Sequence, residues 1–300
     1  MVRSKRLLTP VLALALAGCV FNADQTLPKR VTDATDLVPA NAQVVAFADM
    51  SSALGTFQEL VAMDNSGDFP EAWAKMQEAF AQVNMDPERD IDFVVMYGSE
   101  GSQPVATAVG RFDVDAIADF IEAEMPELQR VEGDGLTAWT HDFTAIALSN
   151  DGTRALAGRD VAALEAALQV RGGANLASVG GPAMQKDSWM IMRDLPSMQG
   201  DGEFPIQEFE LLARAVSDAA LGGSLTTDEA AGTMVLHPRE GVSADDLAAL
   251  VRGVIGAMRM QEIPDEVRER LEAVDVEASA GTVVVTGSVT RTFLEQIARS

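Results

Sequence analysis

A turn, a strand and a helix follow one another in the sequence NDGTRALAGRDVAALEAALQ, which spans residues 150–169. Residues 150–153 form a hairpin turn signal, and a strand follows them. Asp160 then caps a helix that places Leu164 and Leu168 on one face, because residues four apart lie on the same side of a helix. This order predicts a sheet that packs against helices.

The same pattern returns 129 residues further along the chain, where Gly281 and Thr282 correspond to Gly152 and Thr153. Two copies of one pattern fix the element types better than propensity can in either copy. Further correspondences are the helix caps Asp113 and Ser243, the helix-face pairs Leu164/Leu168 and Phe293/Ile297, and the strands 45–50 and 190–195.

The repeat predicts an α+β fold of two tandem similar units, each an antiparallel sheet with helices packed on one face. Repeat one is expected over residues 37–175 and repeat two over residues 185–300. Repeat one contains a hairpin that turns at residues 133–135. Repeat two is expected to replace this hairpin with an amphipathic helix over residues 245–260 and a short helix after Pro264.

Residues 1–18 read as a lipoprotein signal peptide. Three basic residues precede the apolar run 7–17, which is too short to span a bilayer. The run ends LAGC, with Gly18 before Cys19. This ending resembles the lipobox of bacterial lipoproteins, in which the cysteine receives a diacylglycerol and becomes the first residue after cleavage. The resemblance implies cleavage between Gly18 and Cys19, and a lipid membrane as the partner of the acylated Cys19.

The residues after the cysteine bear on location. Val20 stands where an aspartate would resemble the inner-membrane retention signal. The resemblance therefore implies an outer-membrane anchor in a Gram-negative host, with the body facing the periplasm or exposed on the surface. In another host it implies the outer face of the cell membrane. Residues 19–36 are largely polar and contain Pro28, so they are expected to form a flexible tether.

The opening of the body carries a second resemblance. Residues 37–44, LVPANAQV, are similar to the start of an uncharacterised family of exported bacterial proteins. In that family an extended Leu-Pro-Ala-Asp run leads into the first strand of a duplicated α+β domain. Val38 and Asn41 depart from the pattern. The resemblance implies an extracytoplasmic location and carries no catalytic residue onto this chain.

Composition and charge exclude several functions. The 300 residues are 47% hydrophobic, which is typical of a folded globular chain. A formal net charge of −24 repels nucleic acid, so no nucleic-acid partner is expected. One cysteine excludes an intramolecular disulfide framework and a cysteine zinc cluster.

No catalytic motif stands out in the sequence. His141 and His237 have neither a cysteine nor a second histidine at metal-ligand spacing. Both are interpreted as ordinary loop or strand-end residues, with a proton-transfer role as the alternative. The run Gly222-Gly223-Ser224 is followed by no lysine, which argues against a phosphate-binding loop. We therefore predict no catalytic residue and no cofactor.

Two acidic runs are candidate calcium loops. Residues 64–68, DNSGD, fail the pattern because Phe69 stands where glycine is needed and Lys75 where a bidentate glutamate is needed. The denser run keeps a metal hypothesis beside the interpretation as a solvated acidic loop. Its members are Asp86, Glu88, Asp90 and Asp92.

Three functions stay open at this stage. The favoured hypothesis is a non-enzymatic cell-envelope lipoprotein that binds another envelope protein or supports an assembly. The second is a carrier of a lipid or other apolar ligand, because the methionine pairs Met190/Met192 and Met258/Met260 could line a groove as well as fill a core. The third is a hydrolase whose site is assembled from scattered carboxylates.

Overall fold

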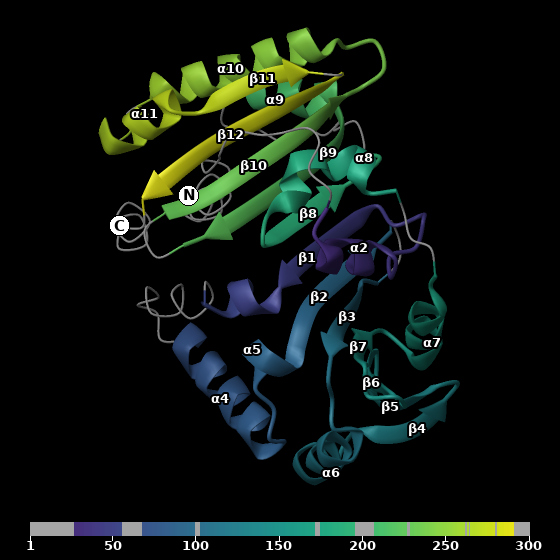
Figure 1. Ribbon diagram of the computed structural model, residues 1–300. Coiled ribbons are helices and arrows are strands. Elements are labelled where there is room, and N and C mark those ends of the chain that lie inside the picture. Colours follow the sequence, from purple (N-terminus) through teal and green to yellow (C-terminus); the bar gives the residue numbers. More distant parts are fainter. Residues whose placement is uncertain are drawn as a thin grey trace. The chain divides into compact units, whose positions relative to one another are not determined.

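The computed structural model describes residues 27–55, 68–99, 103–171, 175–195, 207–226, 229–261, 263, 265–279 and 281–290. The chain divides into two compact units, with the boundary between Asn175 and Leu176. Both units combine antiparallel strands with helices, so the predicted α+β class is confirmed (Figure 1).

The N-terminal unit begins at Pro28. Its strands are β1 (Val44–Asp49), β2 (Ile91–Gly98), β3 (Val105–Gly110), β4 (Gln129–Gly133), β5 (Leu136–His141), β6 (Thr144–Ser149) and β7 (Arg154–Gly158). Its helices are α2 (Lys29–Thr35), α4 (Asp68–Gln82), α5 (Pro87–Asp90), α6 (Val114–Glu124) and α7 (Val161–Gln169), and residues 50–55 are also helical. The sheet order within this unit is β1-β2-β3-β7-β6-β5-β4, and every neighbouring pair is antiparallel.

Helices lie on both faces of this sheet. On one face, α7 packs Leu164 beside Gly158. On the other, α6 buries Ile121 in a cluster with Trp139 and Leu148. The prediction of helices on one face is wrong for this unit. Strands such as β6 place apolar side chains on both faces of the sheet, and helices must bury both faces from water.

Helix α2 corrects the predicted tether. Val31 and Ala34 lie three residues apart, on one side of the helix, and are 2% and 0% exposed. The helix packs against β1 and β2. Residues Lys29–Thr35 therefore belong to the folded unit, and the prediction of a flexible chain through Asp36 is wrong for them.

The C-terminal unit contains a shorter sheet. Its strands are β8 (Ser188–Met192), β9 (Val216–Leu225), β10 (Glu229–Pro238), β11 (Asp275–Ser279) and β12 (Thr282–Thr290). Its helices are α8 (Ala177–Gly180), the 3₁₀ turn η1 (Gly181–Gln185), α9 (Gln207–Ala215), α10 (Ala244–Arg259) and α11 (Asp265–Glu272). The order β8-β9-β10-β12-β11 is antiparallel throughout. Between β10 and β11 the chain forms the helices α10 and α11, as predicted for residues 245–260 and for the stretch after Pro264.

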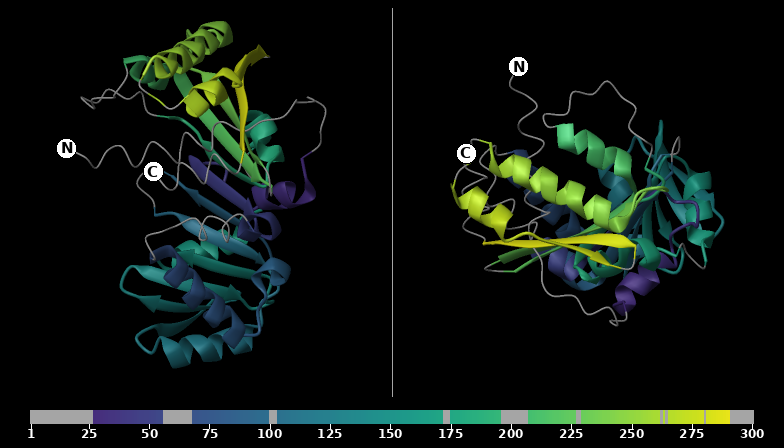
Figure 2. Two further views of the ribbon diagram at one scale, coloured as in Figure 1. Left: turned by 90° about the vertical axis from the view of Figure 1, so that its left-hand side faces the viewer. Right: turned by 90° about the horizontal axis from the view of Figure 1, so that it is seen from above.

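The longer helices of this unit cover one face of its sheet. Figure 2 shows α10 beside α9, and α10 buries Leu247 and Val251 against Leu236 of β10 and Val283 of β12. The opposite face carries η1, which packs against β9 and β10. Residues 176–184 lie between the expected bounds of the two repeats, but Met184 is fully buried and the segment is part of the C-terminal unit.

The two units share one strand order. The series β1-β2-β3-β7-β6 matches β8-β9-β10-β12-β11 in neighbours and in direction. The turns that enter β7 and β12 contain Gly152 and Gly281, with φ of 68° and 83°, a left-handed conformation that favours glycine. These are the glycines that the sequence comparison paired. The order agrees with tandem units, and the duplication itself stays a prediction.

Candidate functional site

A pocket of about 260 Å³ lies in the N-terminal unit between α4, α5 and the helix at residues 50–55. Leu54, Phe80 and Met85 give it a largely apolar lining, and Asp86 and Glu88 supply polar atoms. Its volume falls just short of the range of roughly 300–1,000 Å³ that is typical of small-molecule sites. The pocket could hold a small apolar group, and a polar network lies directly beside it.

The end of α4 shapes this pocket. The N–H of Asn84 donates to Ala81 O at 3.2 Å, and the N–H of Met85 donates to Phe80 O at 2.9 Å. This pair of bonds is a Schellman motif, in which the residue after the helix adopts a left-handed conformation. Asn84 does so with φ of 52°, and asparagine tolerates this conformation better than most residues. The chain therefore reverses and presents Met85 to the pocket.

Helix α5 begins with reciprocal hydrogen bonds. Asp86 caps it by accepting a hydrogen bond from the N–H of Glu88 at 3.1 Å. The N–H of Asp86 in turn donates to Oδ2 of Asp90 at 2.9 Å. Pro87 occupies the first helical position, where no N–H is needed. Two of the acidic residues in the candidate metal run are thus explained by the start of this helix.

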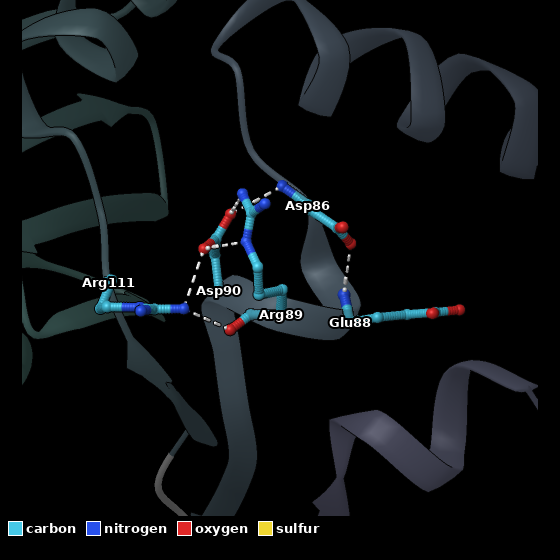
Figure 3. A network of polar contacts seen from close by, with 5 residues as sticks. All are labelled: Asp86, Glu88, Arg89, Asp90 and Arg111. Atoms are coloured by element: carbon cyan, nitrogen blue, oxygen red, sulfur yellow. Dashed lines mark hydrogen bonds and ion pairs between the residues drawn. The ribbon is translucent and has the colours of Figure 1, made fainter.

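Asp90 is the centre of the network (Figure 3). Arg89 Nη2 donates to its Oδ2 at 3.0 Å, and Arg111 Nη2 donates to its Oδ1 at 3.2 Å and to the carbonyl of Arg89 at 2.8 Å. The hydrogen bond from Arg89, with that from the Asp86 N–H, lowers the pKa of Asp90 to about 2. The Asp90 carboxylate is therefore ionised in any physiological medium and paired with two cations.

The geometry does not support the calcium hypothesis. Within the described ranges, no three His, Cys, Asp or Glu side chains lie close enough together to hold a metal ion. The oxygens of Asp90 already accept from arginines, and Asp92 is an exposed residue of β2. The calcium alternative for Asp86, Glu88, Asp90 and Asp92 therefore finds no support in the described residues. The other run, 64–68, lies outside the described residues except for Asp68, which opens α4.

The two histidines lie in different units. His141 is 53% exposed at the end of β5, with Nε2 3.5 Å from the carboxylate of Asp142. His237 Nε2 lies 3.0 Å from the carbonyl of Val179, so this ring ties β10 to α8. Both are the strand-end residues that the sequence predicted, and His237 has a structural role.

The methionine pairs do not form a common lining. Met192 packs against the core cluster under α10, and Met258 packs against a second cluster that contains Leu271. Met260 is 85% exposed at the end of α10. Core packing therefore explains Met192 and Met258, and the groove hypothesis loses the feature that suggested it.

An aromatic side chain projects from the loop between β5 and β6. Phe143 is 78% exposed, and the guanidinium carbon of Arg159 lies 5.9 Å from the centre of its ring. The preceding residue, Asp142, has φ of 50° and turns the chain at this point. Aromatic residues and arginine are both enriched at protein interfaces relative to the rest of the surface.

The predicted anchor residues Gly18 and Cys19 lie outside the described residues. In the part of the chain that is described, no helix has the length and apolarity needed to cross a membrane. Sequence reasoning missed Arg111, which follows β3. The pairing of β2 with β3, once known, would have found it, because Ile91 lies opposite Gly110.

Comparisons with known proteins bear on the fold. No protein-family model and no curated protein matches the chain. Crystal form III of the Treponema protein TP0453 matches with a TM-score of 0.55 at 7% identity, covering 93% of this chain and 100% of that chain. Forms I and IV give 0.51 and 0.52 at 9% and 8% identity, each covering 89% of this chain and 97% and 96% of theirs. This likeness supports the α+β fold and assigns no residue a role.

Proposed function

We propose that this protein is a non-enzymatic, lipid-anchored component of the cell envelope that binds another envelope protein. The LAGC ending of the apolar N-terminal run, at the single cysteine of the chain, carries the proposal. One acyl chain binds a membrane marginally, whereas several acyl chains on Cys19 would anchor the body firmly. Val20 after the cysteine favours the outer membrane in a Gram-negative host.

Labelling with an alkyne analogue of palmitate tests the anchor. Cys19 is the one thiol in the sequence, so a thiol-linked label can be assigned to it. We expect the full chain to carry the label and to sediment with membranes, and the Cys19→Ser variant to lose both properties. A wild-type chain that sediments with membranes without any label would contradict the anchor.

The exposed pair of Phe143 and Arg159 supports the protein-binding part of the proposal. A photocrosslinking amino acid at position 143 should give one discrete adduct in intact envelopes. The matched control is position 75, because Lys75 is also exposed, at 73%, but lies on α4. Equal adduct patterns at both positions would count against a partner at Phe143.

The carrier hypothesis has weaker support. The pocket near α4 holds about 260 Å³, which is too little for an acyl chain with its headgroup. Of the methionines that suggested a groove, Met192 and Met258 pack against core clusters, and Met260 is exposed. If the purified full chain retained a fluorescent fatty acid at a one-to-one ratio, the carrier hypothesis would be favoured over the protein-binding proposal.

The hydrolase hypothesis needs one carboxyl with a raised pKa beside one with a lowered pKa. In the described ranges the resolved carboxyl shifts, at Asp49, Asp90 and Asp151, are all downward. Burial acts to raise the pKa of Asp49, but Ser51 and Arg30 together outweigh it. Each of these carboxylates is already engaged by neighbouring donors, which favours a structural role.

A further inference from the structure

Strand β4 forms an edge of the N-terminal sheet. In the described part of the chain its sheet neighbour is β5, and Figure 1 shows it at the end of the strand series. Its residues Gln129 to Glu132 are exposed and Gly133 is half-buried. An edge of this kind presents N–H and C=O groups that can pair with another strand.

The pairing of β5 shows which groups of β4 face outward. The N–H of Asn150 donates to the carbonyl of Gly135, so the backbone groups of Gly135 point toward β6. The backbone N–H and C=O groups of successive residues in an antiparallel strand point to opposite sides of the strand. The backbone groups of Leu136 and of every second residue after it therefore point toward β4. Their partners are Gly133, Val131 and Gln129. The backbone groups of Arg130 and Glu132 are therefore directed away from the sheet.

The same two residues carry opposite charges on one face of the strand. Arg130 Nη1 lies 2.9 Å from Glu122 Oε1 of α6, and Arg130 Nε lies 2.9 Å from Glu132 Oε1. The Arg130 and Glu132 side chains are 49% and 63% exposed. Between them, Val131 is 38% exposed on the other face. The edge therefore carries Arg130, Val131 and Glu132 in sequence, so an antiparallel second copy would place opposite charges across from each other on either side of the valine.

We propose that β4 pairs antiparallel with β4 of a second copy of this chain, about a two-fold axis at Val131. In this register Arg130 lies opposite the partner subunit's Glu132, and the outward backbone groups of both residues meet. Val131 lies opposite the partner subunit's Val131. Opposite charges directly across neighbouring strands stabilise the pair, and an isologous contact closes after two copies.

Charge selects this register. Outward backbone groups also meet if the strands shift so that Arg130 faces the partner subunit's Arg130, or Glu132 the partner subunit's Glu132. Both shifts place like charges directly opposite each other, which destabilises a strand pair. The contact is small and the chain carries a net charge of −24, so we expect a weak dimer that salt strengthens by screening the overall repulsion.

Disulfide trapping tests the register in the full chain with Cys19→Ser, which removes the native thiol. The proposal does not depend on the lipid anchor, so a result here leaves that function untouched. Val131→Cys should crosslink at least about tenfold faster than Gln129→Cys, because opposed residues of a non-hydrogen-bonded pair lie about 4.5 Å apart at Cα, within disulfide reach. Residue 129 would face the partner subunit's Gly133. Equal rates would overturn the proposal.

Charge reversal tests the same contact by sedimentation equilibrium. Arg130→Glu and Glu132→Arg should each weaken dimerisation about tenfold, and the double variant should restore it. Circular dichroism establishes that each variant is folded before association is compared. A wild-type chain that stays monomeric, a double variant as weak as the singles, or a Val131→Cys thiol that crosslinks in cells to another protein and not to itself would overturn the proposal.

Discussion

Replacing Asp90 with asparagine should destabilise the N-terminal unit by up to about 1 kcal/mol at pH 7. The hydrogen bond from Arg89 and that from the Asp86 N–H hold the pKa of Asp90 at about 2, against an ordinary value of 3.8. That difference corresponds to roughly 2.4 kcal/mol. Water reduces it, because the Arg89 and Arg111 side chains are 66% and 71% exposed. Asparagine keeps an acceptor oxygen and removes the charge.

Hydrogen exchange of peptides from β2 and β3 is the suitable assay, because it reports the unfolding of this unit without assuming that both units unfold together. Asp92→Asn is the matched control, since Asp92 is an exposed carboxylate on the adjoining part of β2. We expect faster exchange in Asp90→Asn than in Asp92→Asn. Equal protection in the two variants would refute the role assigned to Asp90.

Acid should remove the difference. Because folding lowers the pKa of Asp90, its stabilisation is complete above about pH 4 and disappears as the pH falls toward 2. Wild type and Asp90→Asn should therefore differ in urea unfolding at pH 7 and coincide near pH 2. A constant difference across this range would show that the charge is not the cause.

The remaining predictions concern packing and exposure in the C-terminal unit. Gly222→Ala should lower the free energy of unfolding by about 1–3 kcal/mol, because the new Cβ would lie 2.0 Å from Ala183 O. Gly253→Ala in α10 should raise it by up to about 1 kcal/mol, because its Cβ would meet nothing within 4 Å and alanine favours a helix. Thermal unfolding checks both substitutions. If the Gly222→Ala variant unfolded at a higher temperature than the Gly253→Ala variant, the packing of η1 on β9 would be contradicted. Peroxide should oxidise Met260, 85% exposed, well before the fully buried Met184. Peptide mass spectrometry measures the two rates, which would be equal if the end of α10 were covered.

Local features were predictable from the sequence. Asp113, Asp160 and Ser243 were recognised as helix caps, and each accepts a hydrogen bond from a backbone N–H three residues ahead, at 2.9–3.1 Å. Such a bond depends on residues within one turn, so it can be read from a short stretch. The α+β class follows from the same signals, because caps and turns alternate with strands.

Features that depend on distant residues were not predictable. The contact between Asp90 and Arg111 could not be read from the sequence, because it depends on the register of β2 against β3. Helix α2 was missed because two buried residues, Val31 and Ala34, are too few to show a helical period among polar neighbours. The self-complementary edge at β4 likewise emerges only when the strand order is known.

The mass of the N-terminal peptide of the protein purified from membranes tests the lipid anchor most directly. The account predicts a chain that begins at residue 19, with a diacylglycerol on the sulfur of its first residue. A chain that starts at any other residue, or a free thiol at Cys19, would contradict it.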